Sequence, residues 1–503
     1  MTQGLLLSER GSRTAGNLFF YGIAQVSSAL LALVLVGVLS RALGAVGFGA
    51  FSFSFVVASF GALLADFGVG PWLTRAVAQY RGQAGWLLAE VLRLRALMVL
   101  VAGGLTLLLA RLYLRDPSGL AGVAWMLVYV FLLGYVGVYE AVLMGKERAD
   151  RAAVSMGVGK VLELSAVLGW CALGTPRGVA GAAAALAAAC ALRLVLVRAM
   201  ARTVLRIGGE ALADRAAALD ADVAPVTRRM VIREALPFAA GLAVWTTYCK
   251  IDVLLLERLG TPAGLGLYTA AYRVLEALML LPRTFAGVVY PVVSSAWSEN
   301  TMTPMLLARP VRATTALALA CSAGLWVLSP EIMRFLFGPS FVAGAGALHI
   351  LGLALVPLFF NFALGVVLSA THRQGEWVKY LLMASVLNVT ANLVLIPRLG
   401  FEGAAWATLA SESFMLVILW VVVARRHGNP LPILWLARLV LAAMAMGFIV
   451  EHVPGALPIR VAVGLVSFLL MASLLRVILP SEWRALIDLT RRARRGRAHD
   501  PNV

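Results

Sequence analysis

The sequence has few charged residues, few cysteines and none of the short motifs that hold nucleotide phosphates or a catalytic zinc ion. Asp, Glu, Lys and Arg make up 14% of its 503 residues, against about a quarter in soluble domains. No Gly-x-x-x-x-Gly-Lys-Ser/Thr loop is present, so we expect no ATP hydrolysis by this chain. No His-Glu-x-x-His pair or serine-centred Gly-x-Ser-x-Gly turn is present either. We therefore expect a protein that is not an enzyme and that uses no cofactor and no metal.

Cysteine usage agrees with this expectation. The four cysteines, Cys171, Cys190, Cys249 and Cys321, lie in apolar segments and have no paired spacing. Free cysteines in such segments pack as small apolar side chains, so we expect neither disulfides nor a cysteine metal site.

Apolar residues are what the sequence has in abundance, at 61% of the chain and a mean hydropathy of +0.89. Runs of about twenty apolar residues, long enough to cross the hydrocarbon core, recur along its length. A helix satisfies all of its own backbone hydrogen bonds in lipid. We therefore predict an all-α polytopic membrane protein with about fourteen transmembrane helices. Their expected ranges are 16–39, 46–68, 93–114, 120–144, 153–173, 177–200, 235–257, 265–290, 311–329, 344–370, 378–396, 402–424, 431–450 and 460–479.

The net charge of +18 comes from 43 Lys and Arg against 25 Asp and Glu. Most of the basic residues fall in alternate loops and in the two tails, which is the positive-inside pattern of membrane proteins. This pattern predicts that both termini are cytoplasmic. We interpret the densest basic runs, 193–233 and 491–495, as topology signals that also attract anionic lipid, and we expect no nucleic-acid partner.

Two glycine-rich phrases occur in both halves of the chain. Leu43–Phe51 returns as Leu259–Tyr268, and Pro176–Ala183 returns as Pro397–Ala405, at nearly the same separation. Each half holds six predicted helices, so both halves begin on the same side of the membrane and form a parallel repeat. We expect tight turns and close helix packing at these glycines, with direct contact to a cargo as the alternative.

These observations divide the chain into five predicted segments. They are an N-terminal six-helix lobe (1–206), a cytoplasmic linker (207–233), a C-terminal six-helix lobe (234–427), two extra transmembrane helices (428–480) and a basic cytoplasmic tail (481–503). The interface between two such lobes is where transporters bind their cargo.

Polar and charged residues inside the predicted helices are costly in lipid and are therefore candidate functional residues. The candidates for a cavity that binds substrate are Arg273, Arg283, Lys250, Lys160, Asn388 and Asn392. The candidates for ion coupling or for structural ion pairs are Asp252, Glu276, Glu163, Glu140 and Asp66.

Spacing suggests partners for some of these residues. Arg273 and Glu276 are three residues apart and share a helix face, as do Lys160 and Glu163. For Asp252 we expect Arg273 as a partner on the neighbouring helix.

As an alternative to lining a cationic or ion-coupled cavity, the charged pairs could only lock helices together, and Arg283 could only snorkel to the cytoplasmic interface. Ser385, Asn388 and Asn392 stack on one helix face, where they either bond neighbouring helices or bind the hydroxyl groups of a sugar. Pro282, next to Arg283, predicts a break or kink in its helix.

The order of these motifs resembles a known family. Ser40–Phe51 followed by Leu64–Gly70 resembles the opening of bacterial polysaccharide-biosynthesis flippases. In the second half, Ile251–Leu256 precedes Gly264–Arg273, and Pro291 ends the stretch. From about residue 14 to residue 480, the chain resembles the O-antigen-unit and exopolysaccharide-unit flippases of the multidrug/oligosaccharidyl-lipid/polysaccharide exporter superfamily.

The resemblance implies two six-helix lobes around a central cavity, with two further C-terminal helices. It implies that the cargo is an oligosaccharide on undecaprenyl pyrophosphate, moved from the inner to the outer leaflet of the bacterial cytoplasmic (inner) membrane. Membrane lipids, and the glycan polymerase and chain-length enzymes of the same pathway, are the implied partners. Buried Arg and Lys would hold the anionic head of this cargo. Two driving forces for transport are open. One is coupling to an ion through Asp252 or Glu276, and the other is downhill flow of the cargo.

Several alternatives compete with this interpretation. A drug/cation antiporter of the same superfamily generally has twelve spans, whereas a peptidoglycan lipid-precursor flippase shares the fourteen-span plan. A major-facilitator transporter would have a basic turn after its second span, where this chain has Asp66–Gly70. The short outer loops disfavour a glycan polymerase or ligase. A purely structural assembly protein would leave the intramembrane charges unexplained.

Overall fold

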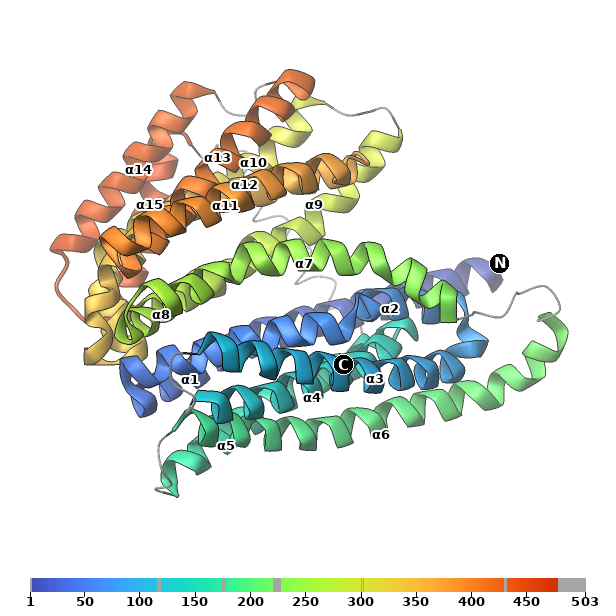
Figure 1. Cartoon of the computed structure of the whole chain (residues 1–503). Helices are drawn as coiled ribbons and strands as arrows, with labels where there is room; N and C mark the ends of the chain where they lie inside the picture. The colour runs from blue at the N-terminus through green and yellow to red at the C-terminus, as the bar shows by residue number, and fades with distance from the viewer. Residues whose placement is uncertain are drawn as a thin grey trace. The chain divides into compact units, whose positions relative to one another are not determined.

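A computed structural model of the chain describes residues 2–114, 119–173, 178–219, 228–299, 301, 303–428 and 432–477. Every regular element in these ranges is a helix, which confirms the predicted all-α fold (Figure 1). The predicted tail at 481–503 and part of the linker at 207–233 lie outside the described residues. The helices are α1 (Thr2–Asp66), α2 (Val69–Gln79), α3 (Ala84–Tyr113), α4 (Leu120–Gly145), α5 (Ala149–Ala172), α6 (Val179–Leu219), α7 (Arg228–Leu259), α8 (Pro262–Leu278), α9 (Leu280–Ser298), α10 (Pro304–Phe337), α11 (Ala345–Ala370), α12 (Gln374–Leu399), α13 (Phe401–His427), α14 (Ile433–His452) and α15 (Leu457–Leu474), with the short 3₁₀ segments η1 (Arg81–Gln83) and η3 (Pro339–Gly344).

Thirteen helical stretches within the described ranges are long and apolar enough to cross a membrane. The first, Tyr21–Gln79, has 59 residues and would be about 90 Å long as one straight helix, three times the hydrocarbon thickness. It covers most of the predicted run 16–39 and all of the run 46–68, and its backbone leaves helical geometry between them at Gly44 (φ 67°, ψ 177°). The thirteen stretches therefore account for the fourteen predicted runs.

The repeated glycine phrases fall where helices break. Gly44 interrupts α1, and Gly400, with φ 61°, separates α12 from α13. At the start of α8, the backbone N–H of Gly264 donates a hydrogen bond to Thr261 Oγ1 at 3.1 Å, which caps the helix. Turn formation is thus confirmed at these three breaks. The beginning of the fourth phrase, at 176–177, lies outside the described residues.

Contacts divide the chain into two compact units. Unit 1 consists of Met1–Arg273, Leu336–Gly344 and Ser385–Ala404. Unit 2 consists of Val274–Phe335, Ala345–Ala384 and Ala405–Val503. The five segments derived from the sequence remain a prediction.

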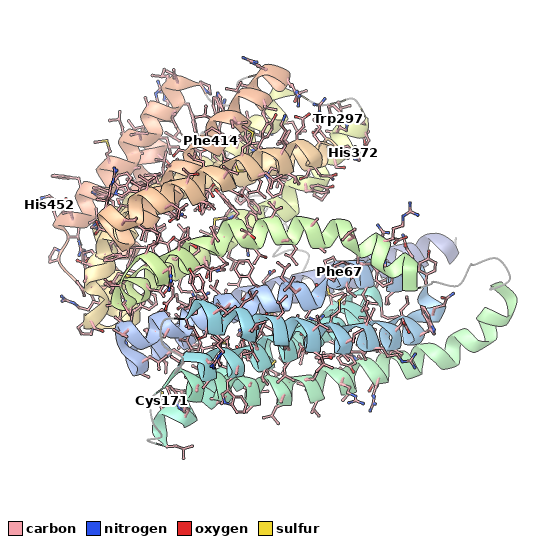
Figure 2. All side chains as sticks on the ribbon, in the orientation of Figure 1. Phe67, Cys171, Trp297, His372, Phe414 and His452 are labelled. Carbon is pink, nitrogen blue, oxygen red and sulfur yellow. The ribbon has the colours of Figure 1, made fainter. Side chains whose placement is uncertain are left out.

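The core of unit 1 is a bundle of α1, α3, α4, α5 and α6, in which α4 packs most extensively on α6 and α1 on α5 (Figure 1). Helix α7 lies against α1 and against the short helix α2. Phe67 (φ 47°) and Gly68 (φ 72°) form the turn that separates α2 from α1 (Figure 2). This turn lets α2 bury Trp72, whose indole N–H donates a hydrogen bond to Glu234 of α7 at 3.0 Å.

Unit 2 contains the two extra C-terminal helices. Helices α14 and α15 form a hairpin whose buried core, including Leu439, Met446 and Phe468, packs on Leu328 and neighbouring residues of α10. Near one end of the hairpin, Arg460 binds Glu331 of α10 at 2.6 Å and donates to the Val450 carbonyl. The hairpin is therefore fastened to α10 by a charge pair as well as by apolar packing.

Candidate functional site

Two of the predicted cavity cations lie over aromatic rings in unit 1. The Lys250 Nζ of α7 is 5.6 Å from the centroid of the Tyr272 ring, and the Arg273 Cζ of α8 is 5.5 Å from the centroid of the Phe55 ring of α1. Both cations are half-buried. The negative face of an aromatic ring stabilises a cation that has lost part of its hydration. This geometry stabilises two half-buried positive charges within unit 1, and a positive charge in such a position attracts an anion.

Asp252 follows Lys250 by two residues on α7 and is buried. Its carboxylate accepts a hydrogen bond from the Tyr268 hydroxyl of α8 and another from the Val253 backbone N–H at 2.9 Å. Tyr268 is fully buried and was missed by the sequence reasoning, because a tyrosine in an apolar run looks like ordinary core. The predicted pairing of Asp252 with Arg273 remains a prediction.

The remaining second-half charges lie in unit 2. Glu276 of α8 is half-buried, and Arg283 of α9 is exposed. The helix interruption predicted at Pro282 is present, but it falls at Met279, between α8 and α9, so that Pro282 occupies the first turn of α9. Proline is tolerated there because the first N–H groups of a helix have no partner within the helix. The predicted pairing of Glu276 with Arg273 remains a prediction.

In the first half, each carboxylate predicted inside a helix is paired with a base. Glu163 binds Lys160 at 2.6 Å, as its spacing suggested, and accepts a hydrogen bond from Tyr129 at 3.1 Å. Glu140 binds Arg193 at 2.8 Å and accepts a hydrogen bond from Ser155 at 2.7 Å. These contacts connect α4, α5 and α6.

Asp66 forms the third of these pairs, with Arg95 of α3 at 2.7 Å. Arg95 and Arg193 are both buried, and the sequence reasoning missed them because each stands near one end of a predicted run, where arginine usually reaches water. The sequence did offer a signal for the two arginines, because the carboxylates of Asp66 and Glu140 inside predicted helices each need a compensating charge.

Two of the candidate substrate-binding residues, Asn388 and Asn392, are hydrogen-bonded to each other on α12 in unit 1. Asn392 donates from Nδ2 to the Asn388 carbonyl oxygen at 2.9 Å and to Asn388 Oδ1 at 3.0 Å. Both side chains are buried, and Asn392 Oδ1 has no hydrogen-bond partner. The pair is thus polar, rigid and able to accept one further hydrogen bond.

A buried acid and amide pair in unit 2 was not among the sequence candidates. Asn361 of α11 donates from Nδ2 to the carbonyl oxygen of Glu412 on α13 at 2.9 Å and to Glu412 Oε2 at 2.7 Å. Both residues are at least nine-tenths buried. Glu412 could have been selected from the sequence, because it is a carboxylate inside the predicted span 402–424 and is as costly in lipid there as Asp252 is in its own span.

The two copies of the first repeated phrase lie against each other in unit 1. A Cβ atom built on Gly49 of α1 would lie 2.7 Å from the Pro262 carbonyl oxygen and 2.9 Å from the Gly266 nitrogen of α8. A Cβ on Gly266 would in turn overlap the Ala45 carbonyl. The backbones of α1 and α8 are therefore in direct contact, at a distance that only glycine allows.

Further contacts surround the glycines. The Phe48 ring of α1 meets the Phe341 ring of η3 edge to face, with centroids 5.9 Å apart. The Ser40 hydroxyl donates to the Phe337 carbonyl oxygen at 3.4 Å. We refer to the contact of residues 40–50 with residues 262–266 and 337–341 as the glycine closure.

Comparison with known proteins identifies relatives of this chain. Residues 15–297 match the sequence model of a family described as polysaccharide biosynthesis protein. The probable low-salt glycan biosynthesis flippase Agl15 of Haloferax volcanii is 28% identical over 173 residues, which are 34% of this chain and 37% of that protein. The probable flippase AglR of the same organism is 26% identical over 170 residues, 33% of this chain and 36% of that protein. The matched segment thus spans little more than a third of each relative.

Solved structures extend the likeness to nearly the whole chain. The lipid II flippase MurJ in an inward closed conformation superposes with a TM-score of 0.72 at 15% identity, covering 93% of this chain and 100% of that chain. An inward-facing multidrug resistance MATE family transporter gives a TM-score of 0.61 at 15% identity, covering 81% and 94%. At such low identity these matches show the fold alone, which is the two-lobe fold of these transporters.

Proposed function

Because the chain belongs to the polysaccharide biosynthesis protein family, we propose that it is a flippase for lipid-linked glycan precursors. In this proposal the cargo is an oligosaccharide repeat unit on undecaprenyl pyrophosphate, moved from the inner to the outer leaflet of the bacterial cytoplasmic membrane. Both termini are then cytoplasmic, as the distribution of basic residues predicts. A sugar and a pyrophosphate cannot cross hydrocarbon unaided, whereas the polyprenyl chain can remain in the lipid.

The observation that carries the proposal is the pair of cations held on aromatic rings, Lys250 over Tyr272 and Arg273 over Phe55. A pyrophosphate needs charge-assisted hydrogen bonds, and the guanidinium group suits phosphate oxygens particularly well. The bases of the first half have carboxylate partners, in the pairs Lys160–Glu163, Arg193–Glu140 and Arg95–Asp66. We therefore assign Lys160 to helix packing. We assign Lys250 and Arg273 to the anionic head of the cargo because both are half-buried cations held over aromatic rings.

The glycine closure supplies the moving part of the mechanism. With the proposed topology, residues 40–50, 259–266, 336–344 and 399–403 all lie at the outer end of their helices. Cargo can leave toward the outer leaflet only if α1 and α8 separate there, as alternating access requires. A contact between glycine backbones suits this role, because Gly49 and Gly266 have no side chains that interlock across it. The Phe48–Phe341 ring contact and the Ser40–Phe337 hydrogen bond must separate as well.

The test is flipping in proteoliposomes with a short fluorescent oligosaccharide on undecaprenyl pyrophosphate, scored by accessibility of the sugar from outside. Removing one charged hydrogen-bonding partner of the pyrophosphate should slow flipping by about tenfold or more. We expect this for Arg273→Gln and Lys250→Gln. The matched control is Arg426→Gln, which removes a charge from the more exposed pair with Glu376.

Two results would contradict the proposal in different ways. Flipping that is equal in all variants would keep the function and remove Arg273 and Lys250 from the site. No flipping by folded protein with any glycan would remove the function. The same vesicles with lipid II or with a cationic dye then test a peptidoglycan-precursor flippase and a drug/cation antiporter.

A further inference from the structure

Unit 2 contains a cavity that the proposed function does not use. It lies between α9 and α10 and has a volume of about 370 Å³. Its walls are Val289, Val292 and Val293 of α9, and Leu306 and Pro310 of α10, with Thr303 and Arg309 as the polar lining residues. It is thus an apolar cavity with one positive charge.

The sequence explains why α9 and α10 do not close over this cavity. Pro291 interrupts the hydrogen bonding of α9, and Pro310 does so in α10. A proline inside a helix removes a backbone hydrogen bond and bends the helix away from the clashing carbonyl. The short side chains of Val289, Val292 and Val293 leave the space between α9 and α10 unfilled.

A second, nearly filled crevice adjoins the cavity through shared lining residues. Val289 and Pro310 line both the cavity and this crevice of about 10 Å³. The crevice continues between Phe285 of α9, Val311 of α10 and Phe362 of α11. Val289 and Pro310 therefore join the apolar lining of the cavity to that of the crevice.

This shape selects a class of ligand. In a membrane, an apolar cavity open at one side is filled by a hydrocarbon chain rather than by water, because water there would lack hydrogen-bonding partners. The exposed Arg309 guanidinium offers a planar fork of donors, which fits the oxygens of a phosphate better than a carbonyl or a hydroxyl. Positive-inside topology places this end of α9 and α10 at the inner leaflet, where phosphate head groups lie.

We propose that the α9–α10 cavity is a binding site for a phosphate-headed lipid, with the phosphate on Arg309 and the hydrocarbon chain along Val289, Val292 and Val293. The lipid is either a polyprenyl phosphate or a bilayer phospholipid, which share this chemistry. The site does not depend on transport, so it can be tested separately from the proposed function.

The experiment uses the full chain in nanodiscs with two photoreactive probes, a diazirine-bearing polyprenyl phosphate and a diazirine-bearing phosphatidylglycerol. Labelled peptides are mapped by mass spectrometry. We expect labelling concentrated on residues 289–310, and a loss of about tenfold in Arg309→Gln, as for a charged hydrogen bond. The matched control is Arg334→Gln, which removes an exposed arginine from the other end of α10.

A second variant tests the cavity rather than the charge. Val292→Trp places a large ring at the cavity wall, and Val292 is 51% exposed, so the substitution should not disturb the core. Its control is Val466→Trp on α15, where the valine is 58% exposed. Labelling that falls only in Val292→Trp and Arg309→Gln supports the site, and the probe that labels identifies the lipid. Labelling spread evenly over exposed helices, and equal in all four variants, would overturn the proposal.

Discussion

A methyl group added at Gly49 should separate the two halves of the glycine closure. The new Cβ would lie 2.7 Å from the Pro262 carbonyl oxygen and 2.9 Å from the Gly266 nitrogen, whereas ordinary contact begins at 3.4 Å. Both obstructing atoms belong to the backbone, so no side chain can rotate out of the way. Helices α1 and α8 must therefore part by about 0.7 Å for Gly49→Ala, and by more for Gly266→Ala.

The energetic consequence can be estimated from the two states of the closure. Overpacking of this kind costs about 1–3 kcal/mol, and it acts only on the closed state. The gain of up to about 1 kcal/mol from replacing a helical glycine by alanine acts on both states and cancels between them. The ratio of open to closed molecules should therefore rise by roughly 5- to 150-fold.

The assay is a distance measurement between spin labels at Val46 and Leu399, both exposed residues of unit 1, in protein whose native cysteines have been replaced. We expect a longer distance to gain population in Gly49→Ala and still more in Gly266→Ala. The control is Gly137→Ala in α4, where an added Cβ meets nothing within 4 Å. A lower melting temperature without any longer distance would refute the reasoning, because the contact would then be static packing.

Three further predictions concern stability and the buried pairs. Glu163→Gln should destabilise the protein by about 3–5 kcal/mol, because Lys160 loses the carboxylate that compensates its charge. Thermal unfolding should show that adding Lys160→Met to this variant restores much of the lost stability. A Glu163→Gln variant as stable as the unchanged protein would contradict a tight pair. Tyr268→Phe should lower the free energy of unfolding by about 1.5–3 kcal/mol, because the hydrogen bond to Asp252 is lost. If the flipping rate of this variant is unchanged, the hydrogen bond has no part in transport. Arg460→Ala should speed hydrogen exchange at the α14–α15 connection, because the ion pair with Glu331 is lost. Exchange in α4 serves as the internal control. Unchanged exchange at the connection would mean that apolar packing alone holds the hairpin on α10.

The helices and the places where they break can be predicted from the amino-acid sequence alone. Hydrophobic run length and the positions of glycine and proline are local properties, and they suffice because an isolated segment in lipid must satisfy its own backbone. The fourteen runs, the turns at Gly44 and Gly400, and the interruption near Pro282 follow from them. The Lys160–Glu163 pair was also accessible, since a spacing of three residues places both side chains on one face of α5.

The partners that meet across helices, in contrast, depend on how the helices pack. Hydropathy and spacing carry no information about the rotation of one helix against another, so Arg193 of α6 with Glu140 of α4 and Asn361 of α11 with Glu412 of α13 could not be paired from the sequence. Tyr268 likewise became a partner of Asp252 only through the packing of α8 on α7. The repeated phrases were visible as a repetition, but their direct contact at Gly49 and Gly266 depends on how close two backbones can approach, which only the packed helices determine.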